Sequence, residues 1–327
     1  MKSLDVEIYD GAGWDMTAVG RSGGVLRDRD GGSTMHSAPS RSSSASSSSS
    51  SSAEPPAPTW DPKQYLRHAG HRSRPFLDLL ARIPELPAAD GGTVRIADLG
   101  CGPGNVTALL ADRWPAARIT GFDNSPEMLD RAREEYEGPT AGGGALDFRA
   151  GDAAHWTPGE PYGLIVSNAA LQWVPNHPDS FAGWIDALVP GGTFAFQVPG
   201  NFTAPSHTLL AELCATPRWR ERLDLPARPP VRVLEPADYL TRLSDLGCTA
   251  DVWETTYLQL LTGEDPVLDW VKGTALRPVL TALKGDEAAT EEFTSQYRDL
   301  LRTAYPAGPH GTVFPFRRIF AVAHKEV

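Results

Sequence analysis

The sequence predicts an α/β fold built on a doubly wound parallel sheet. Between residues 94 and 198, short apolar runs alternate with segments of helical periodicity, which is typical of strands joined by crossover helices. The first apolar run ends in Asp98 and in three alternating glycines, Gly100, Gly102 and Gly104. A glycine turn between a strand and a helix lets the backbone come close to a ligand. We therefore expect a binding site at the carboxyl edge of the sheet.

Two helices should open the folded region, because Asp61 is a favourable N-cap and Pro62 suits the first helical position. Helical patterns and start signals place helices at residues 62–68, 74–82, 106–114, 125–136 and 179–188. The last of these should end at Pro190-Gly191-Gly192, since proline and glycine follow helix ends. The glycine-rich residues 138–144 are expected to form a loop.

Five apolar runs are the expected strands of the parallel part of the sheet, at residues 94–99, 118–123, 146–150, 162–168 and 193–198. The fourth run contains Leu164, Ile165 and Val166. A strand that is apolar on both faces is typical of the buried centre of a parallel sheet, so we place this run centrally.

The last third of the chain is less regular. Helices are expected at residues 206–215, 236–246, 266–283 and 287–303, with a proline- and arginine-rich connection at 217–230. Strands are expected at residues 250–261, which are rich in threonine, tyrosine and tryptophan, and at 312–323.

The first 57 residues differ in composition from the rest. They are rich in glycine, serine and aspartate, and residues 42–52 are nearly pure serine. Such a segment buries too little apolar surface to offset its ordering entropy. We expect a disordered tail over residues 1–57 and a folded domain over residues 58–327.

Composition argues against several classes of protein. The net charge of −11 is unfavourable for broad binding to nucleic acid or to membranes. No apolar run approaches the length of a membrane span. The three cysteines, Cys101, Cys214 and Cys248, show neither metal-ligand nor disulfide spacing. These features favour a cytoplasmic protein that acts on a small molecule.

The spacing of the glycine loop bears on the identity of the nucleotide. A dinucleotide fingerprint needs a third glycine or alanine where this chain has Asn105. Asp123, about twenty residues beyond the loop, can accept both ribose hydroxyls of NAD or of S-adenosylmethionine and does not choose between them. A short-chain dehydrogenase would also need a Tyr-x-x-x-Lys pair, which the sequence lacks.

The G-x-G-x-G loop after Asp98 resembles motif I of the class I S-adenosylmethionine-dependent methyltransferases. From about Trp60 to the C-terminus, the chain resembles the trans-aconitate 2-methyltransferase family. The more specific motifs are Trp60-Asp-Pro with Tyr65-Leu66, Arg72-Ser-Arg-Pro75, Trp114 to Gly121, Ser167 to Trp173, Asp251 to Tyr257 and Leu276-Arg-Pro278. The family's Phe-Pro-Arg appears here as Phe314-Pro-Phe-Arg-Arg-Ile-Phe320, and counting back from Phe320 favours Arg318 as the equivalent arginine.

The resemblance implies a Rossmann-like, seven-stranded, mostly parallel sheet whose last strand is antiparallel, with a helical lid over residues 262–305. It also implies transfer of a methyl group from S-adenosyl-L-methionine to one carboxylate of a small polycarboxylic acid. A carboxylate is anionic at neutral pH, so we expect no general base, and catalysis should come from alignment of the reacting atoms. We also expect no metal. The alternatives are an O-methyltransferase for another small acid or natural product and a non-catalytic cofactor-binding protein.

Cofactor roles follow from the resemblance and from the strand ends. Asp98 would meet the amino group, the three loop glycines would line the methionine and ribose, and Asp123 with Asn124 would hold the ribose. The remaining candidates are Asp152 and Ala153 for adenine, Asn168 on the methionine side, and Tyr65 and Arg72 over the methionine carboxylate. Asp152 has the alternative role of capping a turn.

A polycarboxylate substrate requires cations, and the planar fork of arginine pairs with carboxylates at two points. The candidates are Arg277 in the lid and Arg318 in the last strand; the alternative for each is a surface charge. Arg317 and Arg318 are neighbours on a strand and must point to opposite faces. Weaker candidates are His207, Gln172, Trp173 and Tyr257; Trp173 is equally suited to the core, and His207 to a helix cap.

Overall fold

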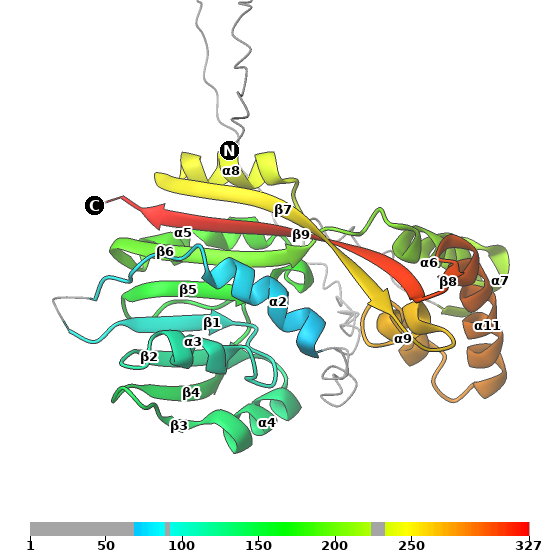
Figure 1. Cartoon of the computed structure of the whole chain (residues 1–327), viewed down its shortest axis with the longest axis horizontal. Coiled ribbons are helices and arrows are strands. Elements are labelled where there is room, and N and C mark those ends of the chain that lie inside the picture. Colours follow the sequence, from blue (N-terminus) through cyan, green and yellow to red (C-terminus); the bar gives the residue numbers. More distant parts are fainter. Residues whose placement is uncertain (1–68, 89–91, 224–232, 327) are drawn as a thin grey trace, which may run out of the picture. The chain divides into compact units, whose positions relative to one another are not determined.

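A nine-stranded mixed sheet forms the centre of the fold in the computed structural model, which describes residues 69–88, 92–223 and 233–326 (Figure 1). These residues all belong to one unit, Pro55–Val327. The expected tail over residues 1–57 and the expected helix at 62–68 lie outside the described residues, as does Tyr65.

All seven expected strands are present, and their spatial order is β4-β2-β1-β5-β6-β9-β7. Their bounds are Arg95–Leu99 (β1), Arg118–Asp123 (β2), Ala145–Ala150 (β4), Tyr162–Asn168 (β5), Leu188–Pro199 (β6), Cys248–Leu261 (β7) and Gly311–Lys325 (β9). Strands β4, β2, β1, β5 and β6 are parallel, whereas β9 runs antiparallel to both β6 and β7. The expected Rossmann-like sheet with an antiparallel last strand is therefore confirmed, and β5 lies near its centre.

Two short strands and one helix were not expected. Gly138–Pro139 (β3) pairs with β4, so the predicted glycine-rich loop begins as an edge strand, and Ala307–Gly308 (β8) pairs with β9. Pro217–Leu223 forms helix α7 where a connection was predicted. This helix is stabilised by the burial of Trp219 and Leu223, four residues apart on one helical face.

The prediction that a helix runs to residue 188 and ends at Pro190-Gly191-Gly192 is wrong. The helix α5 covers only Phe181–Asp186, after a 3₁₀ turn at His177–Ser180, and β6 already begins at Leu188. Leu188 pairs with Tyr162, and the register then shifts before Thr193 pairs with Leu164. The strand thus passes through a bulge, where Gly191 has a φ of 73°.

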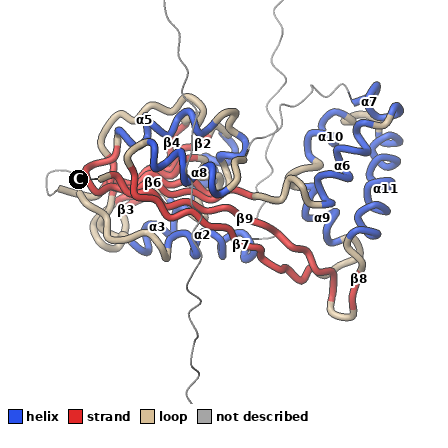
Figure 2. The backbone as a smooth tube through the Cα atoms, turned by 90° about the horizontal axis from the view of Figure 1, so that it is seen from above, coloured by secondary structure: helices blue, strands red, loops and turns tan. Residues whose placement is uncertain are grey.

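Helices cover both faces of the sheet, as Figure 2 shows in a view onto the edge of the sheet, with the strands running across the picture. Helices α2 (Ala69–Leu80), α3 (Thr107–Arg113) and α4 (Pro126–Tyr136) pack on one face, and α5 and α8 (Pro236–Asp245) on the other. The helix α2 begins earlier and ends sooner than the predicted 74–82, and it contains Pro75. Adjacent residues of β1 alternate between the faces, since Ile96 belongs to one buried cluster and Ala97 to the other.

A separate helical unit lies beyond the carboxyl ends of the parallel strands (Figure 1). It consists of α6 (Pro205–Ala215), α7, α9 (Pro266–Lys272), α10 (Arg277–Ala282) and α11 (Glu287–Ala304). These helices share a third buried cluster with the distal parts of β7 and β9, which contribute Leu261, Phe314 and Phe316. The helical unit is therefore larger than the predicted lid at 262–305, because α6 and α7 belong to it as well.

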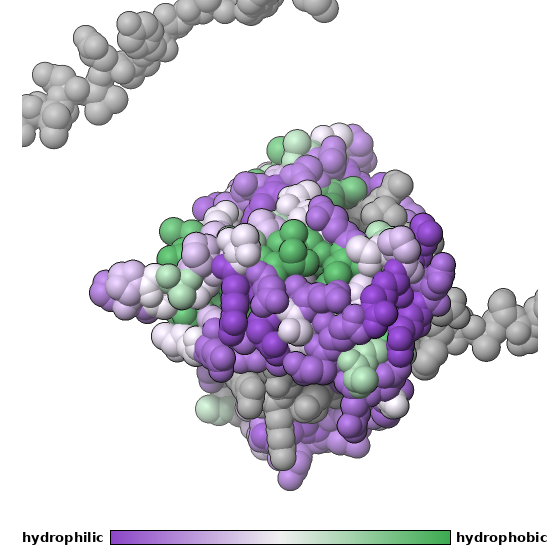
Figure 3. Space-filling model, turned by 90° about the vertical axis from the view of Figure 1, so that its right-hand side faces the viewer, coloured by the Kyte–Doolittle hydropathy of each residue, from purple (hydrophilic) through white to green (hydrophobic). Residues whose placement is uncertain are grey.

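The surface seen from the side of the helical unit is mostly hydrophilic, with smaller apolar areas (Figure 3). No helix among the described residues is long and apolar enough to cross a membrane.

Candidate active site

The glycine loop joins β1 to α3, and all three of its predicted glycines have positive φ angles. A side chain at Gly100 would place its Cβ 2.2 Å from the Cβ of Ala170, and one at Gly104 would meet the ring of Phe148 at 2.9 Å. A Cβ at Gly102 would have no atom of the described residues within 4 Å. Gly100 and Gly104 are thus required by protein packing, whereas Gly102 faces open space that a ligand can approach.

Asp98, at the end of β1, is fully buried. Its Oδ2 accepts a hydrogen bond from the Thr107 hydroxyl at 2.7 Å, but its Oδ1 has no hydrogen-bond partner among the described residues. Burial raises the pKa of this carboxyl group to about 7. A buried acceptor without a partner is costly and rare, so the site is suited to a ligand that brings a donor, such as an ammonium group.

Asp123, at the end of β2, closes the glycine loop against the neighbouring strand. Its Oδ2 accepts the Gly102 N–H at 2.8 Å, and its Oδ1 accepts the Ser125 N–H at 2.9 Å. Burial raises the pKa of Asp123 as well. Each carboxylate oxygen has a second lone pair, so Asp123 can still accept ribose hydroxyls. The adjacent Asn124 is exposed.

Asp152 lies in the turn after β4, and its side chain caps that turn. Its Oδ1 accepts the Ala154 N–H at 3.0 Å, and its Oδ2 lies 2.9 Å from Nδ1 of His155. This is the capping role that the sequence offered as an alternative. Ala153 is half-buried against the second cluster. The turn lies beside the end of β2, because the Gly151 N–H donates to the Asp123 carbonyl at 3.0 Å; the adenine role of Asp152 and Ala153 stays a prediction.

A row of buried polar side chains joins the carboxyl ends of β5 and β6 to the middle of β9. Asn168 on β5 accepts a hydrogen bond at 2.7 Å from the amide of Gln197 on β6, and Gln197 accepts one at 3.2 Å from Arg318 on β9. Each of these three residues has at most 6% of its surface exposed. Gln197 was not predicted; its only signal in the sequence is a lone amide inside the apolar strand Phe194–Val198.

The guanidinium of Arg318 lies 4.5 Å from the centre of the Phe316 ring, a favourable cation–π geometry. Tyr257, on the adjacent strand β7, is close enough for the charge of Arg318 to act on its hydroxyl. The pKa of Tyr257 is nevertheless raised, chiefly by burial and by its hydrogen bond to Asp78. The structure thus brings two predicted substrate residues together at the middle of β9, beside the carboxyl end of β6.

Arg74 joins this group and was missed. Its guanidinium lies 5.2 Å from the centre of the Tyr257 ring. The motif Arg72-Ser-Arg-Pro75 contains it, but the prediction selected Arg72, whose side chain lies outside the described residues. The choice between two arginines in one helical turn depends on which one faces β7, and that packing is not visible in the sequence.

Arg317 points to the opposite face of β9, as the strand geometry requires. It forms ion pairs at 2.5 Å with Glu235 and with Glu254, and it donates to the Gly200 carbonyl at 3.2 Å. Two carboxylates already neutralise this arginine. Of the two neighbours, Arg318 is therefore the one suited to an anionic ligand.

The other predicted substrate residues are distributed more widely. Gln172 and Trp173 form a 3₁₀ turn after β5, where Gln172 donates to the Ala169 carbonyl at 2.5 Å. His207 lies in α6, with Nδ1 3.1 Å from the Ser206 hydroxyl, and burial lowers its pKa to about 4. Arg277 begins α10. His207 and Arg277 thus belong to the helical unit rather than to the sheet.

Asn201 is a third residue that the sequence analysis missed, after Gln197 and Arg74. It follows β6 by two positions and is 5% exposed, yet neither its Oδ1 nor its Nδ2 has a hydrogen-bond partner among the described residues. The Gly200 N–H still donates to the Arg317 carbonyl, so the ladder with β9 continues to that point. Asn201 follows the carboxyl end of β6, and its buried amide, unpartnered among the described residues, is suited to a polar ligand.

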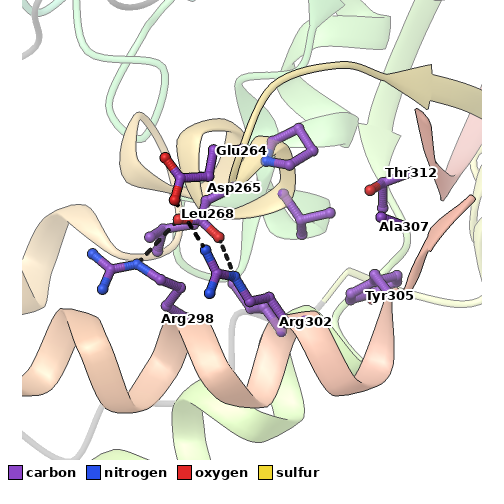
Figure 4. Close-up of a pocket in the computed structure, with 11 residues that line it drawn as sticks. Glu264, Asp265, Leu268, Arg298, Arg302, Tyr305, Ala307 and Thr312 are labelled. Atoms are coloured by element: carbon purple, nitrogen blue, oxygen red, sulfur yellow. Dashed lines mark hydrogen bonds and ion pairs between the residues drawn. The ribbon is translucent and has the colours of Figure 1, made fainter.

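A surface pocket in the helical unit is not part of this site (Figure 4). It has a volume of about 240 Å³, and it contains two arginines. Arg298 contacts Asp265 at 3.1 Å, and Arg302 contacts Asp265 at 2.7 Å and Glu264 at 3.5 Å. These carboxylates neutralise both cations, so the pocket offers little attraction to an anion.

Several known proteins are similar to this chain in sequence. A family described as "Methyltransferase domain" matches residues 96–192. Trans-aconitate 2-methyltransferase from Streptomyces coelicolor is 68% identical over 269 residues, which cover 82% of this chain and 88% of the relative. The chain belongs to the trans-aconitate 2-methyltransferase family. The enzyme of that name from Streptomyces avermitilis is 66% identical over 82% of this chain and 98% of its own length.

Among solved structures, the YcgJ protein from Bacillus subtilis has a TM-score of 0.46 and 16% identity, covering 79% of this chain and 99% of that one. Membership of the trans-aconitate 2-methyltransferase family confirms the class predicted from the glycine loop and excludes the NAD enzyme. The residues also fit S-adenosylmethionine, because Asp98 has an acceptor atom for an ammonium group and Gly102 leaves space beside the loop.

Proposed function

We propose that this protein transfers the methyl group of S-adenosylmethionine to one carboxylate of trans-aconitate and forms a monomethyl ester. The observation that carries the proposal is the place of Arg318. Its buried guanidinium is joined through Gln197 to Asn168, the residue predicted to lie on the methionine side of the cofactor. A cation therefore lies close to the carboxyl edge of the sheet, where the glycine loop also lies. The relatives at 66–68% identity, named for this reaction, support the same substrate.

On the cofactor side, three groups have separate tasks. Asp98 accepts a hydrogen bond from the ammonium group through Oδ1, and Asp123 accepts from the ribose hydroxyls through its remaining lone pairs. Gly102 allows the backbone to approach closely. When bound, S-adenosylmethionine supplies an electrophilic methyl group on a positively charged sulfur.

On the substrate side, cations select a molecule with several carboxylates. Arg318 binds one carboxylate in a buried setting, where charge interactions are stronger than in water. Arg74 and Tyr257 flank that position. We assign Arg277, at the start of α10, as a further cation for the substrate, contributed by the helical unit acting as a lid. Asn201 donates a further hydrogen bond from its amide. Selectivity for a trianion follows from this local cluster, although the chain as a whole is acidic.

The chemistry needs no proton transfer. One carboxylate oxygen of the substrate forms a bond to the methyl carbon while the carbon–sulfur bond breaks, and the carboxylate is already ionised at neutral pH. His207, with a pKa near 4, is neutral there. The residues contribute by holding oxygen, carbon and sulfur in line at close distance, which lowers the entropic part of the barrier.

The free state of the three cysteines is typical of a reducing compartment, so we assign this activity to the cytoplasm.

The test is methyl transfer from labelled S-adenosylmethionine to a panel of acids: trans-aconitate, cis-aconitate, isocitrate, citrate and a monocarboxylic fatty acid. Trans-aconitate should have the highest kcat/KM, and the fatty acid should not react. Preference for the fatty acid, or cofactor binding without turnover of any tricarboxylate, would contradict the proposed substrate.

A further inference from the structure

We infer that Gln197 is a positioning residue that holds Arg318 and Asn168 in one hydrogen-bonded relay and so fixes the substrate carboxylate relative to the cofactor. This role rests on the proposed function. Gln197 is fully buried in β6, and Phe194, Ala195, Phe196 and Val198 around it are fully buried apolar residues. An amide buried among such neighbours is unfavourable unless both of its ends are hydrogen-bonded.

The direction of the relay is set by Arg318. A guanidinium only donates hydrogen bonds, so the group of Gln197 that faces it at 3.2 Å must be the carbonyl oxygen. The amide nitrogen of Gln197 then faces Asn168, which must accept through its Oδ1 at 2.7 Å. The remaining donor group of Asn168 is thereby turned away from Gln197. One arginine thus determines the orientation of two amides across three strands.

The backbone of these strands does not need this side chain. β6 is hydrogen-bonded to β5 and to β9 by its main chain from Thr193 onward. A second side-chain contact joins the same two strands, between the Thr193 hydroxyl and Nδ1 of His324 at 3.0 Å. It lies four residues before Gln197, about 13 Å along the strand and away from the carboxyl edge. That contact is a matched control, since it joins a buried Thr193 to a half-buried His324 on the same two strands, β6 and β9, without touching Arg318.

The consequence concerns binding of the substrate. An arginine side chain has many rotamers, and holding it in one reduces the entropy lost when a carboxylate binds. Without Gln197, Arg318 loses the hydrogen bond that fixes its guanidinium across the strands and keeps its contact with the Phe316 ring, so the substrate must supply more of its ordering. The KM for trans-aconitate should rise, and the effect should disappear when the side chain at position 318 cannot use the relay.

The experiment compares Gln197→Met, which keeps the length but forms no hydrogen bond to the guanidinium, with Gln197→Glu, which keeps the shape but adds a carboxylate. Thr193→Val is the control. Each variant is combined with Arg318→Met, whose side chain cannot donate a hydrogen bond to Gln197, in a double-mutant cycle. Kinetics in both substrates, cofactor affinity by calorimetry and the melting temperature are measured on the full-length chain.

Gln197→Met should raise the KM for trans-aconitate at least fivefold in the wild-type background and less than twofold in the Arg318→Met background. Gln197→Glu should raise KM further, because its carboxylate competes with the substrate for Arg318. Thr193→Val should leave KM unchanged. The relay is refuted if either Gln197 variant that folds raises KM less than fivefold, or if its effect is the same in both backgrounds.

Failure of the proposed function has a different signature. If the wild-type protein does not methylate trans-aconitate, that function is wrong, and the same cycle is run with the acid of the panel that it does methylate. A KM for that acid that does not depend on Gln197 then refutes the relay.

Discussion

Cofactor affinity should depend on pH through Asp98. Burial raises the pKa of this carboxyl group from 3.8 to about 7, so at pH 6 it is mostly protonated in the protein without ligand. An ammonium group bound at Oδ1 favours the ionised form. Only the ionised form of Asp98 binds the ammonium group well, so the apparent Kd is proportional to 1 + 10^(7 − pH) for a pKa of about 7. Binding should therefore be about tenfold weaker at pH 6 than at pH 8.

The raised pKa of Asp98 also makes the free energy of unfolding depend on pH. The folded state without ligand holds the proton on Asp98 between about pH 4 and pH 7, whereas the unfolded state has released it. Stability is therefore highest, for this group, below pH 4 and falls as the pH rises toward 7. Three pKa units at about 1.4 kcal/mol each give an upper limit of roughly 4 kcal/mol. Asp98→Asn should thus melt higher than the wild-type protein at pH 8 and bind the cofactor more weakly.

The assay is calorimetry of cofactor binding between pH 6 and pH 8 in two buffers of different ionisation enthalpy. At pH 6, about one proton should be released when the cofactor binds to the wild-type protein. The Asp98→Asn variant should not release this proton. Thr107→Val removes a hydrogen bond that lowers the pKa of Asp98, so it should move the transition to higher pH. A wild-type Kd that is constant over this range would refute the assignment of Asp98.

Three further predictions concern the loop, the ribose carboxylate and the substrate arginine. Arg318→Ala should lower kcat/KM for trans-aconitate at least about tenfold with nearly unchanged cofactor affinity, because a buried substrate charge loses its partner; normal kinetics would remove Arg318 from the site. Asp123→Ala should weaken cofactor binding in calorimetry, since it removes the predicted ribose acceptor and releases the Gly102 N–H; an unchanged Kd would contradict both roles. Gly100→Ala should lower the melting temperature strongly because its Cβ would lie 2.2 Å from Ala170. Gly102→Ala should be milder, about 1 kcal/mol for its positive φ, while weakening the cofactor; the reverse order of melting temperatures would refute the assignment of open space to Gly102.

The parts of the fold that could be predicted are those encoded locally. Each parallel strand is a short apolar run, and Asp98, Gly102 and Asp123 lie at strand ends that a parallel sheet must bring to one edge. Local signals failed where tertiary contacts override them. Pro190-Gly191-Gly192 has the composition of a helix end, but pairing of Leu188 with Tyr162 extends β6 through it. The arginines and prolines around residue 217 predicted an irregular connection. Burial of Trp219 instead stabilises the helix α7 there.

The substrate side could be predicted only in part, for a physical reason. Arg318 was found from a motif, but its neighbour Gln197 is 121 positions away in the chain and becomes significant only when β6 and β9 pair. Asn201 carries no signal beyond its residue type, because what distinguishes it is burial without a partner among the described residues.

In the proposed reaction, the methyl group moves to a carboxylate oxygen of a tricarboxylic acid. The most direct measurement incubates the protein with trans-aconitate and S-adenosylmethionine labelled in its methyl group, and then treats the isolated product with alkali. A labelled monomethyl ester of trans-aconitate that releases labelled methanol is the predicted result. A label that is stable to alkali, or that is absent from trans-aconitate while another acceptor carries it, would contradict the account.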